Sequence, residues 1–234
     1  MLARMSPRPS AAAIVLAAGA GRRLGADEPK AFLTIGGRPI LAVAAAAAAA
    51  SGAIDEMIVT VPDGFEDRAR GCVEGLGIPC TVIPGGDSRQ ASVRAALAAA
   101  GSIELVAVHD AARPFAPPDL FVSVLDAVDA DVDGAVPVLP VADTVKRIEG
   151  GFIIATVPRD ELALAQTPQA FRVTALRDAH DRAAASRLGV TDDAQLLEAV
   201  GHRVRAIAGD PMNTKITTML DLARADARMG GADA

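Results

Sequence analysis

The chain has 234 residues, 51% of them hydrophobic, and a formal net charge of -6 at pH 7. This length and hydrophobic content allow one well-packed domain with an appendage. The acidic balance and an aromatic content of 6 Phe, with no Trp or Tyr, argue against a nucleic-acid-binding surface, which needs a basic face and stacking rings.

The N-terminal segment, residues 1–11, precedes the first predicted strand, and we expect it to be a disordered extension. Its first ten residues mix Pro and Arg with polar residues and lack the apolar segment of a secretory signal. The alanine tract Ala44–Ala50 is too short to cross a bilayer. We therefore expect a cytoplasmic protein with no membrane partner, with residues 12–234 forming a single domain.

From residue 12 onward, apolar runs of strand length alternate with alanine-rich stretches of helical length, a pattern typical of successive βαβ units. The predicted strands are Ala12–Ala17, Ile54–Val61, Thr81–Ile83, Leu105–His109, Gly134–Val141 and Val204–Ile207. The predicted helices are Pro39–Ala50, Phe65–Leu76, Arg89–Ala99, Pro118–Asp129, Val173–Arg187, Asp192–Ala199 and Thr217–Met229. The sequence therefore predicts an α/β fold with a mostly parallel, Rossmann-like sheet flanked by helices.

Segment 143–171 interrupts this alternation. Two runs with strand character, Thr144–Ile148 and Phe152–Val157, flank Glu149-Gly150-Gly151, which is a hairpin signal. A hairpin inserted between a sheet strand and a helix projects from the domain, and an isolated two-stranded ribbon is only marginally stable in water. We therefore predict a projecting β-arm that packs against a second copy of the chain.

The cysteines and histidines do not form a metal-binding pattern. Cys72 and Cys80 lack C-x-x-C spacing, and His109, His180 and His202 are not spaced to complete a cluster with them. We expect two reduced structural thiols, no bound zinc and a structural role for His109.

The glycine-rich stretch LAAGAGRRLG, Leu16–Gly25, follows the first predicted strand and matches neither the dinucleotide fingerprint nor the phosphate loop. Its small residues let backbone N–H groups approach a ligand, while Arg22, Arg23 and Lys30 supply positive charge, so the stretch suits an anion. Open α/β sheets bind ligands at this end of their strands. Taken by itself, such a stretch is more often a flexible surface turn with solvated charges.

Polar and charged residues follow three further predicted strands. They are Asp110–Pro114, Thr144 with Lys146, and Asn213–Thr217. The carboxyl ends of parallel strands meet at one edge of a sheet, so we expect these residues to converge with the glycine-rich stretch on one ligand site.

Seven motifs occur in order between about Ala12 and Leu222: LAAGAGRRLG followed by PKAFL, then GGDSRQASV, VHDAARPF, DTVKR, TPQAF, TDDA and NTKITT. With these motifs the chain resembles the 2-C-methyl-D-erythritol 4-phosphate cytidylyltransferases. The resemblance implies a nucleotidyltransferase domain over residues 12–234 with a β-arm insertion at about 143–171, and a homodimer with exchanged arms. It also implies transfer of CMP from CTP to 2-C-methyl-D-erythritol 4-phosphate in isoprenoid precursor biosynthesis, with Mg²⁺ or another divalent cation as cofactor.

The same resemblance assigns the site residues. The CTP phosphates would lie on Gly19, Gly21, Arg23, Lys30 and Lys215, of which Arg23, Lys30 and Lys215 are the catalytic residues. The cytosine would lie on Ala17, Ala18, Gly86, Asp87 and Ser92. Asp110 would lie near the ribose and the metal-bound phosphates, and it is the one candidate for a direct metal ligand. The methylerythritol phosphate would be held by Arg113, Thr144 and Thr191, with Arg159 supplied by the partner's arm.

The chemistry implied by the resemblance needs no protein base, because a phosphate monoester has its second pKa near 6 and is mostly ionised at neutral pH. Two alternatives remain: a cytidylyltransferase for another polyol phosphate, such as ribitol 5-phosphate, and an inactive nucleotide-binding protein. Asp143, Glu161 and the pair Asp192-Asp193 are interpreted as helix caps or solvated charges.

Overall fold

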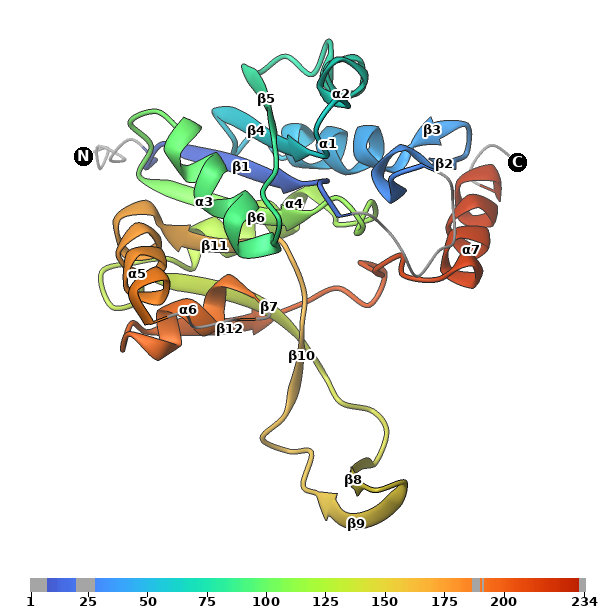
Figure 1. Cartoon of the computed structure of the whole chain (residues 1–234), viewed down its shortest axis with the longest axis vertical. Coiled ribbons are helices and arrows are strands. Elements are labelled where there is room, and N and C mark those ends of the chain that lie inside the picture. The colour runs from blue at the N-terminus through green and yellow to red at the C-terminus, as the bar shows by residue number, and fades with distance from the viewer. Residues whose placement is uncertain (1–7, 20–27, 187–189, 191, 232–234) are drawn as a thin grey trace, which may run out of the picture.

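The structure is a computed structural model that describes residues 8–19, 28–186, 190 and 192–231. The predicted site residues Gly21, Arg23 and Thr191 lie outside these ranges. The chain forms a body in which helices cover both faces of a central sheet, and a long hairpin projects from one end of that body (Figure 1).

The central sheet has eight strands in the described part of the chain. They are β1 (Ala11–Leu16), β4 (Glu56–Val61), β5 (Cys80–Pro84), β6 (Leu105–Asp110), β7 (Gly134–Pro140), β10 (Ala163–Ala165), β11 (Gln169–Arg172) and β12 (Val204–Ala208). Their order is β10-β7-β11-β6-β1-β4-β5, with β12 paired to β7. β10 and β11 run antiparallel to their neighbours, and the remaining pairings are parallel. The predicted, mostly parallel α/β sheet is confirmed, although β10 and β11 were not predicted.

Helices pack on the two faces of the sheet in separate hydrophobic clusters. On one face lie α1 (Ile40–Ala50), α2 (Glu66–Val73) and α4 (Pro118–Asp126), and on the other lie α3 (Arg89–Ala99), α5 (Val173–Ser186) and α6 (Asp193–Ala199). A third cluster joins α7 (Met219–Gly230) to the short strand β2 (Thr34–Ile35) and the start of α1. None of the helices in the described ranges is both long and apolar enough to cross a membrane.

Local side chains fix where the helices nearest the sheet edge begin. The Ser88 hydroxyl accepts a hydrogen bond from the Ala91 N–H and caps α3, and the Asp192 carboxylate does the same for α6 through Gln195. Thr218 forms a reciprocal capping box with Asp221 at the start of α7. Such caps satisfy N–H groups that the first helical turn leaves without partners.

Some boundaries differ from the predictions. α1 begins at Ile40, because Pro39 belongs to the two-residue strand β3 (Arg38–Pro39) that pairs with β2. The turn between these strands places Gly36 and Gly37 at φ angles of 54° and 71°, which favour glycine. Helices α2 and α4 end three residues earlier than predicted, at Val73 and Asp126.

The predicted extension over residues 1–11 reaches too far along the chain. β1 already begins at Ala11, whose N–H donates to the Asp55 carboxylate at 2.8 Å. Arg8 also bonds to that carboxylate and to the Ala53 carbonyl. These contacts tie Arg8 and Ala11 to the segment directly before β4, so residues 8–11 are part of the folded body.

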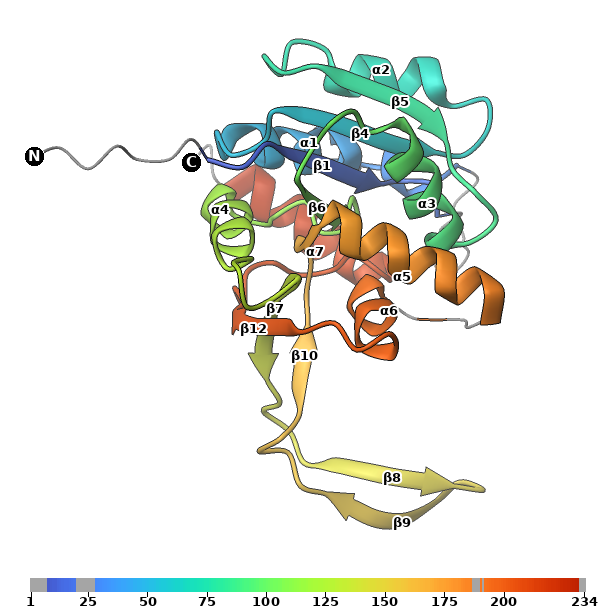
Figure 2. The ribbon, with the colours of Figure 1, turned by 90° about the vertical axis from the view of Figure 1, so that its left-hand side faces the viewer.

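The hairpin predicted for residues 144–157 is present and stands apart from the body in two perpendicular views (Figures 1 and 2). It consists of β8 (Val145–Glu149) and β9 (Phe152–Val157), joined by Gly150 and Gly151. Large apolar side chains cover it, and Phe152, for example, is 76% exposed. We call residues 141–162 the arm.

Candidate active site

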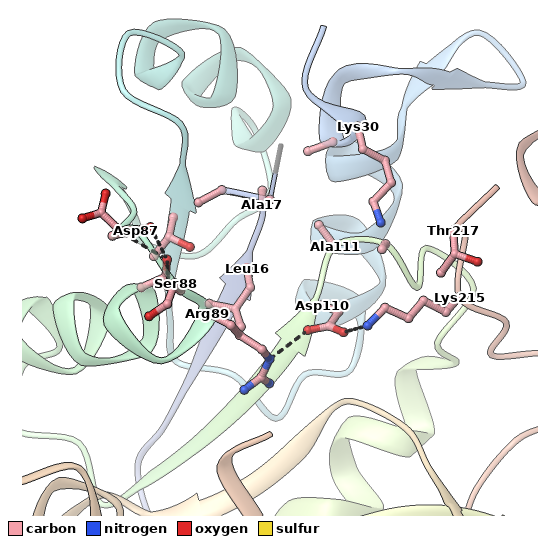
Figure 3. A pocket seen from close by; sticks show the side chains of 17 residues that line it. Leu16, Ala17, Lys30, Asp87, Ser88, Arg89, Asp110, Ala111, Lys215 and Thr217 are labelled. Atoms are coloured by element: carbon pink, nitrogen blue, oxygen red, sulfur yellow. Dashed lines mark hydrogen bonds and ion pairs between the residues drawn. The ribbon is translucent and has the colours of Figure 1, made fainter. Parts of the chain in front are cut away.

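A cavity of about 720 Å³ lies at the carboxyl edge of the sheet, where β1, β4 and β6 end (Figure 3). Two further segments complete it, the turn between β5 and α3 and the segment before α7. The described residues that line it are Leu16, Ala17, Ala18, Gly19, Lys30, Ala31, Thr60, Gly86, Asp87, Ser88, Arg89, Ser92, Asp110, Ala111, Ala112, Lys215 and Thr217.

One wall of this cavity is built from small residues in close contact. A Cβ atom at Gly85 would lie 2.3 Å from the Ala18 Cβ, and one at Gly86 would lie 2.5 Å from the Ala91 Cβ. The Ala17 N–H donates to the Thr60 carbonyl at 2.8 Å, which extends the β1–β4 pairing to the cavity rim. These positions leave backbone groups within reach of a flat ligand.

The turn that begins at Gly86 is held by the buried side chain of Ser92. The Ser92 hydroxyl accepts from the Gly86 N–H at 3.1 Å and donates to the Ser88 carbonyl at 3.0 Å. The Ser92 side chain therefore fixes the shape of the turn that carries Asp87.

The opposite wall carries two lysines that come from distant parts of the sequence. Lys30 begins the short 3-10 helix η2 (Lys30–Phe32), and its Nζ donates to the Ile216 carbonyl at 3.0 Å. Lys215 Nζ lies 2.6 Å from Asp110 Oδ2. Figure 3 shows Lys30 reaching down toward this pair. The two ammonium groups thus lie on the same side of the cavity and suit an anionic ligand.

Asp110 stays ionised although its side chain is largely buried. Burial raises the pKa of this carboxyl, but the Lys215 ammonium and the Arg89 guanidinium outweigh that effect and lower the pKa to about 2. The cavity therefore holds a fixed carboxylate between two cations.

His109 directly precedes Asp110 in β6 and is fully buried. Its Nδ1 is 3.1 Å from Thr167 Oγ1, and its Nε2 is 3.1 Å from the Arg113 carbonyl. Because the Arg113 carbonyl can only accept, we assign the proton of the neutral ring to Nε2, and Nδ1 accepts from the Thr167 hydroxyl, whose oxygen accepts from the Asp110 N–H. Burial is the main cause that lowers the pKa of His109 to about 4. These contacts give His109 the structural role that the sequence predicted.

Among the residues that the structure describes, the predicted acceptor-binding residues Arg113, Thr144 and Arg159 do not line this cavity. Thr144 and Arg159 lie on the arm, where Arg159 donates to the Ala142 carbonyl. Arg113 donates to the carbonyls of Asn213 at 2.9 Å and Ala165 at 3.3 Å. The prediction that the residues after β7 converge with the other strand ends is therefore wrong within one chain, because β7 and β10 continue as a ribbon that carries residues 141–162 away from the body.

Sequence reasoning missed several residues of the cavity, and Arg89 is the most consequential. It lies within the GGDSRQASV motif directly after Asp87 and Ser88, and that position was its one sequence signal. Thr60 was also missed, and its hydroxyl has no partner among the described residues. The interpretation of Asp193 as a cap or a solvated charge is wrong, because it is 1% exposed and pairs with Arg89, while Asp192 caps α6.

The described residues contain no group of three or more His, Cys, Asp or Glu side chains able to hold a metal ion, and Cys72 and Cys80 are free thiols. Asp110 and Asp87 are the acidic side chains among the described lining residues. Mg²⁺ commonly binds through one or two carboxylates together with substrate phosphates. The donor set therefore fits a divalent cation that arrives with a nucleotide.

This Rossmann-like sheet, with a small-residue wall and lysines at its carboxyl edge, defines an α/β nucleotide-binding protein of the nucleotidyltransferase type. The profile of the 2-C-methyl-D-erythritol 4-phosphate cytidylyltransferase family matches residues 11–231. The chain belongs to this family and is a nucleotidyltransferase.

Individual relatives agree with this assignment. A 2-C-methyl-D-erythritol 4-phosphate cytidylyltransferase of Rhodococcus opacus is 45% identical over 92% of this chain and 93% of its own length. The crystal structure of the enzyme of the same name from Thermus thermophilus is 39% identical, with a TM-score of 0.79 over 95% of this chain and 99% of that one. A 4-diphosphocytidyl-2C-methyl-D-erythritol synthase structure from Anaerococcus prevotii is 30% identical, with a TM-score of 0.83 over 95% of this chain and 99% of that one.

Proposed function

We propose that this protein transfers CMP from CTP to 2-C-methyl-D-erythritol 4-phosphate, which gives 4-diphosphocytidyl-2-C-methyl-D-erythritol and pyrophosphate for isoprenoid precursor biosynthesis. The two substrates are inferred from the family to which the chain belongs. The observation that carries the proposal is the cavity itself, in which a close-packed wall of small residues faces Lys30 and Lys215 across Asp110.

The nucleotide lies across this cavity. Its cytosine rests on the small-residue wall, against Ala17, Ala18, Gly86, Asp87 and Ser92. Its phosphates extend toward Gly19 and the two lysines. The predicted phosphate-binding residues Gly21 and Arg23 belong to the same glycine-rich stretch. Asp110 faces the ribose and the phosphates between these two ends.

The reaction forms a bond between an oxygen of the acceptor phosphate and the α-phosphorus of CTP, and it breaks the bond from that phosphorus to the pyrophosphate oxygen. The attacking monoester is already mostly ionised near neutral pH, since its second pKa is about 6. The described residues lining the cavity include neither His nor Cys, which agrees with this. The protein's task is to align two anions and to stabilise charge on the phosphoryl oxygens and the leaving group.

Lys30 and Lys215 carry out the second of these tasks. Each ammonium group is already positioned before CTP binds, Lys30 by the Ile216 carbonyl and Lys215 by Asp110. Such preorganised charges stabilise a transition state without further rearrangement. Asp110 would hold Mg²⁺ together with the CTP phosphates, and the cation would neutralise part of their charge.

The acceptor site is completed by a second copy of the chain in a homodimer with exchanged arms. Two observations support this arrangement. Thr144 and Arg159 lie on an arm that cannot place them in the cavity of its own chain as it stands. The arm also exposes Ile148, Phe152 and Ile153 by 65%, 76% and 66%, which is unfavourable in water unless a partner covers them.

Mixing two inactive variants tests the shared site. Arg159→Ala removes the arm contribution, and Lys30→Ala removes the cavity contribution. After subunit exchange, a mixed dimer contains one site with both native residues, so activity should recover. Absence of recovery after exchange has been demonstrated, for example by subunit labelling, would mean that Arg159 does not act in its partner's site.

The activity itself is tested by pyrophosphate release from CTP and Mg²⁺ with 2-C-methyl-D-erythritol 4-phosphate, with ribitol 5-phosphate and with no acceptor. We expect release only with the methylerythritol phosphate. Preference for ribitol 5-phosphate would retain the mechanism and change the acceptor. No release with any acceptor, from folded protein that still binds CTP, would contradict the proposal in favour of an inactive nucleotide-binding protein.

A further inference from the structure

Arg89, the first residue of α3, contacts two carboxylates that come from different parts of the sheet. Its Nε lies 3.5 Å from Asp110 Oδ1 in the cavity, and its Nη1 lies 2.5 Å from Asp193 Oδ2 at the start of α6. Lys215 holds the other oxygen of Asp110 at 2.6 Å. Figure 3 shows Arg89, Asp110 and Lys215 in one row across the floor of the cavity.

We propose that Arg89 is a positioning residue for the transfer reaction: anchored by Asp193, it fixes the orientation of the Asp110 carboxylate in the nucleotide site. This inference deepens the proposed function and depends on it. It assigns to Arg89 no contact with the reacting atoms.

The geometry explains why an arginine is suited to this position. A carboxylate held at only one oxygen can still rotate, whereas cations on both oxygens fix its plane. Lys215 makes the closer contact with Asp110, at 2.6 Å against 3.5 Å for Arg89, but its side chain is 40% exposed and ends a flexible stem. Arg89 presents two donors of one planar group to two carboxylates, and Asp193 is 1% exposed and therefore fixed by its surroundings.

The same contact joins the start of α3 to the start of α6. α6 begins at Asp193, and its cap Asp192 is held in turn by the side-chain amide of Gln169 on β11 at 3.0 Å. Thr191, which the sequence predicts to bind the acceptor, directly precedes Asp192 in the chain. Arg89 therefore links the turn that carries Asp87 and Ser88 to the start of the helix that follows Thr191.

This cluster is poorly arranged for stability alone. Arg89 Nη2, Asp193 Oδ1 and both ring nitrogens of the buried His180 lack hydrogen-bond partners among the described residues. The closest approach between His180 Nε2 and Asp193 Oδ1 is 3.6 Å. Buried ion pairs with unsatisfied atoms are often no more stabilising than apolar residues of similar volume. We therefore interpret the Arg89 contacts as serving mainly to orient the Asp110 carboxylate rather than to stabilise the fold.

Arg89 could orient Asp110, or it could only neutralise the buried charge of Asp193. The double variant Arg89→Met/Asp193→Asn distinguishes these two roles. Arg89→Met alone leaves Asp193 buried without a counter-charge, so we expect a lower melting temperature as well as lower activity. The double variant removes both charges, so its melting temperature should return to within a few degrees of the wild type. Its kcat/KM for CTP should stay about 10²-fold low, the loss that a misplacement of about 1 Å produces.

Two further variants define the mechanism. Arg89→Lys keeps a positive charge for Asp193 but cannot place one donor on each carboxylate, so it should retain the melting temperature and only part of kcat/KM. Arg94→Met removes an exposed arginine from the same helix and should leave both quantities unchanged. Wild-type kcat/KM in the double variant would overturn the inference, because Arg89 would then only neutralise Asp193.

Calorimetric titration with CTP and Mg²⁺, without acceptor, distinguishes failure of this inference from failure of the proposed function. A misoriented Asp110 should weaken CTP binding in the double variant relative to the wild type. If the wild type binds CTP but transfers CMP to no acceptor, the proposed function fails and the CTP affinities still decide the role of Arg89. Equal affinities in both proteins would overturn that role.

Discussion

Replacing Gly85 by Ala tests the small-residue wall at the point where it is most closely packed. The added Cβ would lie 2.3 Å from the Ala18 Cβ and 2.9 Å from Ser92 Oγ. Carbon atoms pack at about 3.5–4.0 Å, so Ala18 would have to move by about 1.2 Å or more. Gly85 itself cannot easily retreat, because its N–H donates to the Val61 carbonyl at 2.7 Å.

Both groups that must move belong to the predicted cytosine site. Overpacking of this kind costs about 1–3 kcal/mol of folding stability, which a domain of this size tolerates. A misplacement of about 1 Å in a binding site can cost about 10² in rate. Gly85→Ala should therefore be folded, with a lower melting temperature and a kcat/KM for CTP that is lower by about 10²-fold, mainly through a higher KM for CTP.

Two comparisons make this assay specific. Gly101→Ala adds the same methyl group where its nearest atoms are the Glu56 carboxylate oxygens at 3.9 Å, so its kinetics should be those of the wild type. The double variant Gly85→Ala/Ala18→Gly removes the closest clash but keeps the one with Ser92, so it should recover part of the lost activity. An unchanged KM for CTP in Gly85→Ala would refute the placement of the cytosine on this wall.

Three further predictions concern separate parts of the molecule. Lys30→Ala should lower kcat by about 10²–10³, the effect of losing one preorganised donor, with an unchanged circular dichroism spectrum. Burial lowers the pKa of His109 from 6.5 to about 4, so the neutral ring stabilises the folded protein fully above pH 6.5. The free energy of unfolding should fall by about 3 kcal/mol between pH 6.5 and pH 4, because the ring becomes protonated in the unfolded chain first. The urea midpoint of His109→Gln should depend less on pH in this window than that of the wild type. Phe152→Asp on the arm should shift sedimentation toward the monomer and reduce turnover together, whereas a fully active monomer would refute the shared site.

The fold could be predicted from the sequence wherever burial leaves a pattern in the residues themselves. β1 and β6 are covered on both faces, so they appear as continuous apolar runs, and the helices between strands are long enough to be recognised. β11 escaped prediction because it has four residues, begins with a buried Gln, and is defined by its pairing with β6 and β7. Such pairing joins residues that are distant in the sequence, so no local sequence pattern predicts it.

In the site, too, residues with a local sequence pattern could be predicted, and residues defined by distant contacts could not. Lys30, Asp110 and Lys215 could be predicted because each belongs to a motif of charged and small residues at the end of a strand or loop. The role of Arg89 could not, because its anchor Asp193 is 104 residues away and looks like an ordinary first-turn acid. The arm was predictable as a hairpin, but its direction depends on the pairing of β10 with β7.

These two halves of the site differ in what they need in order to form. The lysines, the small-residue wall and the Arg89–Asp110 contact are assembled by one chain, through backbone and side-chain bonds within the body. Thr144 and Arg159 lie on the arm, and in the proposed homodimer they act in the site of a second chain. CTP binding should therefore survive dissociation of the dimer while transfer does not, since the cavity keeps its nucleotide contacts but loses those that align the acceptor phosphate. In this arrangement dimer formation controls the reaction step and leaves the preceding nucleotide-binding step within each subunit.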